Sequence, residues 1–371
     1  MSRTAIGLAL LLLSAGPQAA AELPLPSLRH YFAAYERGQR PGAAVLVLEG
    51  NRVLHQQGYG LADLQRRQAI TPRTSFDLAS LSKQFTALGV ALLADKGKLS
   101  YDDPACRYLP RLPGYARQIT IRQLIHHTSG LPEYLELAGG KRVPSTNADV
   151  VELLRQQPGL KAPPGARHQY NNTGYVLLAS IIERVSGRSY GEFLRHNLFR
   201  PLGMNRTFVE GERAVGPQAR GYRRIPGLRR FGLAREATGG SAIVGDGGVH
   251  SCLDDMRKWA LGMQQGKLVR ADTLRRVFSK GTNRKGRPVN YGFGWWFEKH
   301  ASHSVAVHTG TWKGFKNVMA YVPERKLWVI VLGNSGGASP RKLLRPWLAS
   351  YLDRRPARPA TPRRRDHGSL R

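Results

Sequence analysis

Three short motifs, in one order along the chain, carry residue types that can perform acyl transfer. They are Ser80-x-x-Lys83, Tyr170-x-Asn172 and His308-Thr309-Gly310. A serine hydroxyl becomes a good nucleophile when a base takes its proton, and a lysine can be that base where burial lowers its pKa toward neutrality. A phenol can pass protons between such groups, and an asparagine amide can hydrogen-bond a substrate amide. Together the motifs predict a serine nucleophile activated by a lysine and a tyrosine.

A second S-x-x-K match, Ser339-Pro340-Arg341-Lys342, makes the choice of nucleophile a question of context. It lies in a loop rich in Gly, Ser and Pro that leads into a basic C-terminal helix. Ser80 instead opens an apolar segment that runs to Asp95 and predicts a buried helix ending at Gly97. Residues i and i+3 share a helix face, so the Ser80 hydroxyl and the Lys83 ammonium would approach within one turn. The helix N-terminus would add partial positive charge where an oxyanion develops.

Each of the first two motifs also has a purely structural interpretation. Ser80 can cap a helix whose first turn exposes Lys83 to solvent. Asn172 can likewise cap the helix predicted from Val176 to Val185 while Tyr170 packs its ring. The occurrence of all three motifs in one chain favours the chemical interpretation.

The third motif follows the apolar run Val305-Ala306-Val307 and is therefore predicted to end a strand that lines a cleft. Gly310 would let a substrate backbone approach that strand closely. A lone histidine at a strand end is usually structural, so the interpretation of His308 depends on the other two motifs.

The order of the motifs resembles the serine β-lactamase and D,D-peptidase superfamily, in the branch with class C β-lactamases, D-aminopeptidases and β-lactamase-like esterases. The similarity spans about residues 27 to 352. Further similar segments are Ile119–Pro132, Pro201–Met204, Gly247–Val249 with Asp255–Met256, and Tyr291–Trp295.

The resemblance implies a role for each matching residue. Ser80 would be the acylated nucleophile, with Lys83 and Tyr170 as general base and acid. The backbone N–H groups of Ser80 and Thr311 would form the oxyanion hole. The substrate contacts would come from Asn172, His308, Thr309 and Gly310. Neither a cofactor nor a metal is expected.

Two features depart from the class C and class A patterns. His308 stands where class C β-lactamases usually have a lysine, and histidine there resembles D,D-peptidases, D-aminopeptidases and related esterases. An unperturbed imidazole titrates near pH 6.5, so we expect any help from His308 in binding a substrate carboxylate to fade between about pH 6 and 8. The Asp or Asn helix motif and the deacylating glutamate of class A are not recognisable. Deacylation would therefore use Tyr170 and Lys83.

The fold class expected is α/β of the α+β kind, β-lactamase/transpeptidase-like. Gly50-Asn51 suits a hairpin turn between two strands, and three more strands lie near the C-terminus. Most segments between these ends look helical, so we expect one antiparallel sheet formed by both chain ends, with a helical region inserted and the catalytic groups at the junction. The strands predicted are Ala43–Glu49, Arg52–Gln57, Val305–His308, Phe315–Tyr321 and Leu327–Leu332.

The N-terminus has the pattern of a signal peptide. Arg3 precedes the apolar run Ile6–Leu13, and Ala19-Ala20-Ala21 offers a cleavage site before Glu22. We expect a signal peptide at 1–21, a hydrolase domain at 22–353 and a disordered Arg-rich tail at 354–371. No further segment is long and apolar enough for a transmembrane anchor. Cleavage near Ala21 would place the mature chain in the periplasm or outside the cell.

The formal net charge of +32 predicts anionic partners. A nucleic-acid-binding protein is the obvious alternative class, but no helix-turn-helix, zinc or RNA-recognition signature is present and the leader directs export. Anionic cell-envelope polymers are therefore the expected electrostatic partners, beside a small-molecule or peptide substrate.

Two smaller features leave alternatives open or favour structure over chemistry. Cys106 and Cys252 can pair in an oxidising compartment, but their count alone does not decide it. His126-His127 is better explained by a structural loop than by a metal site, since adjacent side chains diverge and no further ligand has suitable spacing.

The sequence as a whole predicts an exported serine acyl hydrolase that acts through an acyl-enzyme on amide or ester bonds. D-amino-acid peptides, β-lactams and small esters all remain open as substrates. The alternatives are a dedicated class C-like β-lactamase and a catalytically idle envelope-binding protein that keeps the fold.

Overall fold

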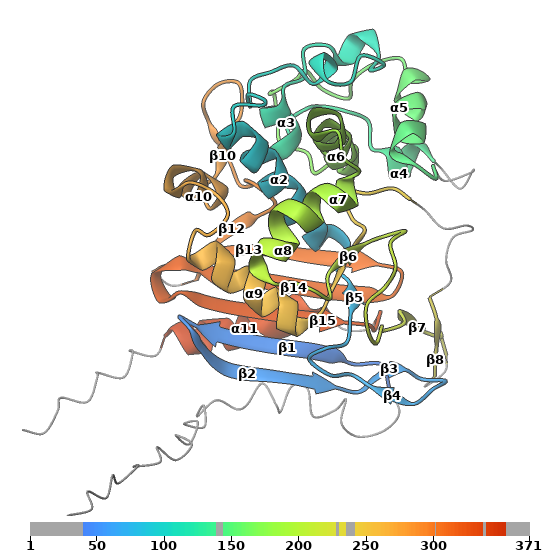
Figure 1. Ribbon diagram of the computed structural model, residues 1–371, viewed down its shortest axis with the longest axis vertical. Helices are drawn as coiled ribbons and strands as arrows, with labels where there is room; N and C mark the ends of the chain where they lie inside the picture. Colours follow the sequence, from blue (N-terminus) through green and yellow to red (C-terminus); the bar gives the residue numbers. More distant parts are fainter. Residues whose placement is uncertain are drawn as a thin grey trace, which may run out of the picture.

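A six-stranded antiparallel sheet joins the two ends of the described chain (Figure 1). The computed structural model describes residues 40–138, 144–227, 230–234, 242–300, 302–336 and 339–353. The predicted signal peptide and tail lie outside these residues. In spatial order the strands are β12 (Trp296–His300), β13 (His303–Trp312), β14 (Phe315–Val322), β15 (Leu327–Gly333), β1 (Ala43–Glu49) and β2 (Arg52–Tyr59). The predicted fold class is therefore confirmed.

Strand β1 explains why the sheet needs cover on both faces. Its side chains alternate between two hydrophobic clusters, since successive residues of a strand point to opposite faces. Val45 and Val47 pack beneath α11 (Pro340–Leu352), together with Trp347. Leu46 belongs to the larger cluster that the sheet shares with the helical region.

The inserted region covers the other face and is mainly helical (Figure 1). Its centre is α2 (Lys83–Asp95), which is apolar nearly all round and buried as far as Leu93, beside α6 (Asn172–Ser186). Around them lie α3 (Ile121–Ile125), α4 (Tyr134–Leu137), α5 (Asn147–Arg155), α7 (Tyr190–Leu194), α8 (Arg200–Leu202), α9 (Leu253–Gln264) and α10 (Ala271–Val277).

Within the described residues, short strands form four further small sheets. A three-stranded sheet has the order β5 (Phe76–Asp77), β9 (Val249–Ser251) and β6 (Phe208–Val209). Three pairs complete the strands: β3 (Leu61–Asp63) with β4 (Gln68–Ala69), β7 (Tyr222–Arg224) with β8 (Phe231–Leu233), and β10 (Gly281–Thr282) with β11 (Pro288–Val289).

Three local expectations change in detail. The helix predicted from Ser80 begins as a 3₁₀ turn, Ala79–Ser82, before α2. The strand predicted to end at His308 continues to Trp312, because β14 pairs with it along that whole length. Strand β12 was not predicted.

Two further expectations concern the pairing of the cysteines and the absence of a membrane-spanning segment. Cys106 and Cys252 are both free thiols, and Cys252 is buried. None of the helices within the described residues has the length and apolar character needed to cross a bilayer.

Candidate active site

Ser80 lies on a strained turn that leads into α2. The preceding residue, Ala79, has a φ of 50°, which L-residues other than Asn and Asp seldom adopt. The Asp77 carboxylate accepts a hydrogen bond from the Ala79 N–H at 2.8 Å and so supports this conformation. Such strain persists where the surroundings over-determine it, and here it places Ser80 in the lining of a cleft.

Lys83 is completely buried and lies next to the Ser80 hydroxyl. Its Nζ donates to Ser80 Oγ at 3.2 Å, to Asn172 Oδ1 at 2.8 Å and to the Asp246 carbonyl at 2.6 Å. An ammonium group has three N–H donors, so each is satisfied. The structure thus rules out the solvated lysine of the structural alternative.

Tyr170 and Asn172 approach the same lysine from the start of α6. The residue that caps α6 is Asn171, whose side chain accepts from the Gly174 N–H at 2.9 Å. Asn172 is therefore free of the capping role and turns its amide oxygen to Lys83. The Tyr170 ring centroid lies 5.1 Å from Lys83 Nζ.

Aromatic neighbours hold the Tyr170 ring in place. His127 lies 4.3 Å from it, and the Trp296 ring is stacked at 6.2 Å with an interplanar angle of 16°. The backbone N–H of Asn172 donates to Glu133 at 2.6 Å, which fixes the turn that follows Tyr170. Burial raises the pKa of the Glu133 carboxyl, whereas the hydrogen bonds from the backbone N–H groups of Asn172 and Leu135 act to lower it.

Strand β13 packs directly against the segment that precedes Ser80. A Cβ at Gly310 would lie 2.2 Å from the Leu78 carbonyl oxygen, so only glycine fits there. The sequence analysis gave a different reason for a glycine at this position, namely the close approach of a substrate backbone. Thr311, one residue further, does line the cleft.

His308 is a buried residue of β13, and its imidazole is neutral. Its Nδ1 lies 2.7 Å from the Thr309 carbonyl, which can only accept, so Nδ1 carries the proton and Nε2 accepts from the Tyr291 hydroxyl at 3.1 Å. Burial, aided by the charge of Lys83, lowers the pKa of His308 to about 3. The expectation that His308 titrates between pH 6 and 8 was therefore wrong.

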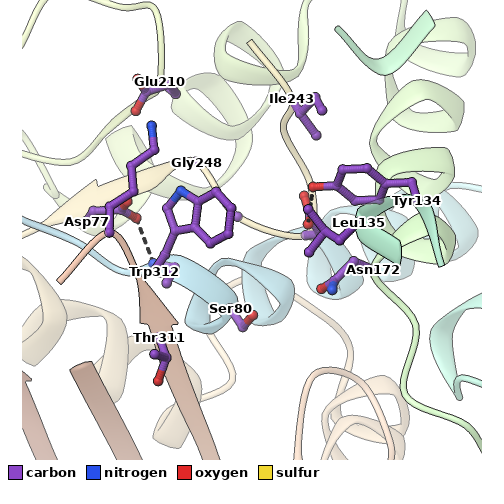
Figure 2. A pocket seen from close by; sticks show the side chains of 14 residues that line it. Asp77, Ser80, Tyr134, Leu135, Asn172, Glu210, Ile243, Gly248, Thr311 and Trp312 are labelled. Atoms are coloured by element: carbon purple, nitrogen blue, oxygen red, sulfur yellow. Dashed lines mark hydrogen bonds between the residues drawn. The ribbon is translucent and has the colours of Figure 1, made fainter. Parts of the chain in front are cut away.

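The cleft is open to solvent, and the space between its lining residues amounts to about 650 Å³ with the open solvent at its mouth included. Figure 2 shows Ser80 and Thr311 in its lower part, with Trp312 above them, Asp77 and Glu210 on one side, and Asn172 on the other side. Of the sequence-predicted site residues, Ser80, Asn172 and Thr311 line the cleft. Lys83 lies directly behind Ser80. The other predicted residues do not line it: His308 and Gly310 are buried, whereas Tyr170 and Thr309 are partly exposed.

Asp246 is a cleft residue that the sequence analysis missed. Its side chain is buried, and one carboxylate oxygen accepts from the Tyr134 hydroxyl at 3.1 Å. Burial raises the pKa of this carboxyl, while the charge of Lys83 and the bond from Tyr134 act to lower it. A signal was present, because Asp246 directly precedes Gly247-Gly248 in one of the similar segments.

A second group of charges lies at the other side of the cleft. Glu210 and His250 form an ion pair at 2.7 Å. Burial acts to lower the pKa of His250, but the hydrogen bond that its ring donates to Glu210 and the charge of Asp77 outweigh burial and raise that pKa. Lys313 also lines this side. The hydrogen bond from His250 lowers the pKa of Glu210, and the charge of Lys313 adds to that effect.

The adjacent pair His126-His127 lies in a buried loop. Burial lowers the pKa of His126 to about 4, and His127 Nδ1 accepts from the Asn171 N–H at 3.2 Å. Within the described ranges, no group of three or more His, Cys, Asp or Glu side chains is arranged to hold a metal ion.

Comparisons with known proteins agree with this architecture. The sequence profile named Beta-lactamase matches residues 28–353. Penicillin-binding protein 4* of Bacillus subtilis is 34% identical over 307 residues, which are 78% of this chain and 67% of that protein. A D-aminopeptidase of Gluconobacter oxydans is 30% identical over 309 residues, 81% of this chain and 57% of that protein.

A solved structure shares the fold. The octameric penicillin-binding protein homologue from Pyrococcus abyssi superposes with a TM-score of 0.74 at 28% identity, covering 84% of this chain and 73% of that one. The chain spans about two thirds of the first curated relative and a smaller share of the second. It belongs to the β-lactamase family of serine hydrolases, within the serine β-lactamase and D,D-peptidase superfamily that its three motifs resemble.

Proposed function

We propose that this protein is an exported serine acyl hydrolase that cleaves the amide bond after an amino-terminal D-residue through an acyl-enzyme on Ser80. The observation that carries the proposal is the contact of the buried Lys83 ammonium with Ser80 Oγ and Asn172 Oδ1. It combines a nucleophile with a group that can move its proton, at the edge of a cleft that admits a small substrate.

In this proposal, the Lys83 ammonium first loses one proton to solvent, and the resulting amine takes the Ser80 proton as Oγ bonds to the substrate carbonyl carbon. The backbone N–H groups of Ser80 and Thr311 hold the resulting oxyanion. Lys83 and Tyr170 then return a proton to the leaving amine as the C–N bond breaks. Water releases the acid from Ser80 by the same proton transfers in reverse.

The charges in the cleft favour a substrate with a free ammonium group. Neutral His308 offers no positive charge for a substrate carboxylate, and Lys313 is the one basic side chain among the described lining residues, against the three carboxyl groups of Asp77, Glu210 and Asp246. Asp246 instead presents a carboxyl beside Ser80 and Asn172, and a substrate ammonium would favour its ionised form. The similarity to a D-aminopeptidase supports the same choice.

A second candidate is acylation by β-lactams with slow release. The names of the Bacillus subtilis and Pyrococcus abyssi relatives, both penicillin-binding proteins, favour it. A dedicated β-lactamase would instead release the β-lactam acyl group quickly, and a catalytically idle binding protein would not be acylated.

The test compares D-alanine p-nitroanilide with its N-acetyl derivative. The free amine should be hydrolysed with a higher kcat/KM, and Asp246→Asn should lower that value about 10- to 100-fold, because a charge-assisted hydrogen bond contributes about 1.5–3 kcal/mol. The acetylated substrate should change little. Asp272→Asn, an exposed carboxylate elsewhere, serves as the control. Equal rates on both substrates would refute the ammonium preference, and a fast turnover of penicillins alone would favour the β-lactamase.

Export and the tail belong to the same proposal. Residues 1–21 would be removed as a signal peptide, and 354–371 would remain as a disordered basic tail. N-terminal sequencing of the exported protein should give Glu22 as the first residue, and retention of Met1 in the exported chain would refute the cleavage.

A further inference from the structure

Next to the cleft, two adjoining hollows of the described surface have walls rich in arginine. Arg195 and Arg200 line both hollows. Arg188 and His196 line the smaller one, and Arg213 lines the larger one. We call the two hollows with these five residues the arginine groove.

One continuous helical stretch presents most of the groove. Helix α7 runs into a π-helical turn, Arg195–Phe199, and then into α8, while Arg188 lies just before α7. The basic side chains are thus spread over several helical turns. An elongated distribution of positive charge suits an extended anion better than a single small one. Wide π-helical turns are also frequent at functional sites.

The carboxylates of the groove are already engaged. Glu212 pairs with Arg195 and accepts from the Val209 N–H at 2.9 Å. Glu192 accepts from the backbone N–H and hydroxyl of Ser189 as part of a helix cap. Three exposed guanidinium groups form no ion pair with any described residue: those of Arg188, Arg200 and Arg213.

We propose that the arginine groove binds an anionic polymer that carries repeated phosphate groups. The planar guanidinium group matches a phosphate with two parallel hydrogen bonds, so arginine is the residue best suited to this partner. A membrane surface fits less well, since interfacial binding buries an apolar face. Among the described residues, Val215 is the one exposed large apolar side chain that borders the groove.

The groove adjoins the catalytic cleft. Strand β6 and the turn after it border both the arginine groove and the catalytic cleft, because Phe208 lines the groove and Glu210 lines the cleft. His250 joins the two sides, since its ring stacks on Phe208 at 4.9 Å and pairs with Glu210. A polymer bound in the groove would therefore hold the enzyme with its catalytic cleft next to that polymer. The proposal does not depend on the reaction at Ser80.

The experiment measures binding of fluorescently labelled inorganic polyphosphate to the mature chain by anisotropy, at several salt concentrations. Replacing Arg188, Arg200 and Arg213 together by alanine should weaken binding at least about tenfold near physiological salt. The plot of log K against log salt should become shallower by about 2, since each phosphate contact adds about 0.7–0.9 to the slope. The single variant Arg200→Ala should cause about one third of that decrease in slope.

The matched control removes the same charge elsewhere. Replacing Arg111, Arg117 and Arg287 by alanine takes three exposed arginines from other surfaces and should change affinity less than about twofold. Equal losses in the two triple variants would overturn the proposal in favour of net charge alone. Loss of binding to phosphatidylglycerol vesicles in the groove variant, with polyphosphate binding intact, would assign the groove to a lipid surface and equally overturn it.

Discussion

Single residues around Ser80 show how burial decides the chemistry of ionisable groups. Lys83 keeps three hydrogen-bond acceptors although it has no contact with solvent. His308 is equally enclosed but meets a carbonyl and a hydroxyl, which together stabilise one neutral tautomer. Asp246 lies at the cleft with one hydroxyl donor. The region around Ser80 therefore holds a buried lysine, a neutral histidine and a buried carboxyl group, each with its own hydrogen-bond partners.

The low pKa of His308 predicts a specific acid sensitivity. Between pH 6.5 and about 3 the unfolded chain binds a proton at this residue that the folded chain does not bind. The free energy of unfolding should thus fall as the pH drops below 6.5, by about 1.4 kcal/mol per pH unit for that proton. In urea titrations from pH 7 to 4.5, His308→Gln should show a shallower decline than the wild type.

The exposed histidine His196 provides the control for this experiment, because His196→Gln should leave the decline unchanged. The slope is the readout, so a uniform loss of stability in His308→Gln does not obscure the result. A decline as steep as that of the wild type would show that His308 is protonated in the folded protein.

Two elements converge on the nucleophile, and their contact is closer than ordinary packing. The turn before α2 places Ala79 at positive φ, and β13 lies against that turn with Gly310 at Leu78. Because the strand presents Thr311 one residue later, the position of the proposed oxyanion hole depends on this contact. The sequence motifs located both elements. The need for glycine at position 310, however, depends on the Leu78 carbonyl oxygen that lies opposite it in the folded chain.

Gly310→Ala should therefore impair catalysis. Its Cβ would overlap the Leu78 carbonyl oxygen and force the strand away from Ser80, and a misplacement of about 1 Å can lower rates about 100-fold. The measurement is kcat/KM on D-alanine p-nitroanilide together with the melting temperature. Gly159→Ala, where a Cβ meets nothing within 4 Å, should be neutral. Full activity in Gly310→Ala would mean that the strand and the turn move independently.

At the scale of the whole molecule, the sequence predicted the features that rest on local pattern. The strands at both chain ends, the helical insertion and the meeting of Ser80 with Lys83 follow from hydrophobic periodicity and i, i+3 spacing. Asp246 and the arginine groove were missed, because both arise from side chains that only the folded chain brings together. Likewise, the neutral state of His308 depends on burial and on the charge of Lys83, which other segments of the folded chain supply.

The same architecture separates the two candidate nucleophiles. Ser80 lines the cleft on the side of the sheet that the helical region covers, whereas Ser339 lies at the start of α11 on the opposite face of the sheet. The sharpest test is labelling with a fluorophosphonate, followed by intact-mass analysis and peptide mapping. The account predicts one adduct on Ser80 in the wild type and in Ser339→Ala, and none in Ser80→Ala. Equal labelling of the wild type and Ser80→Ala would contradict the assignment of the active site.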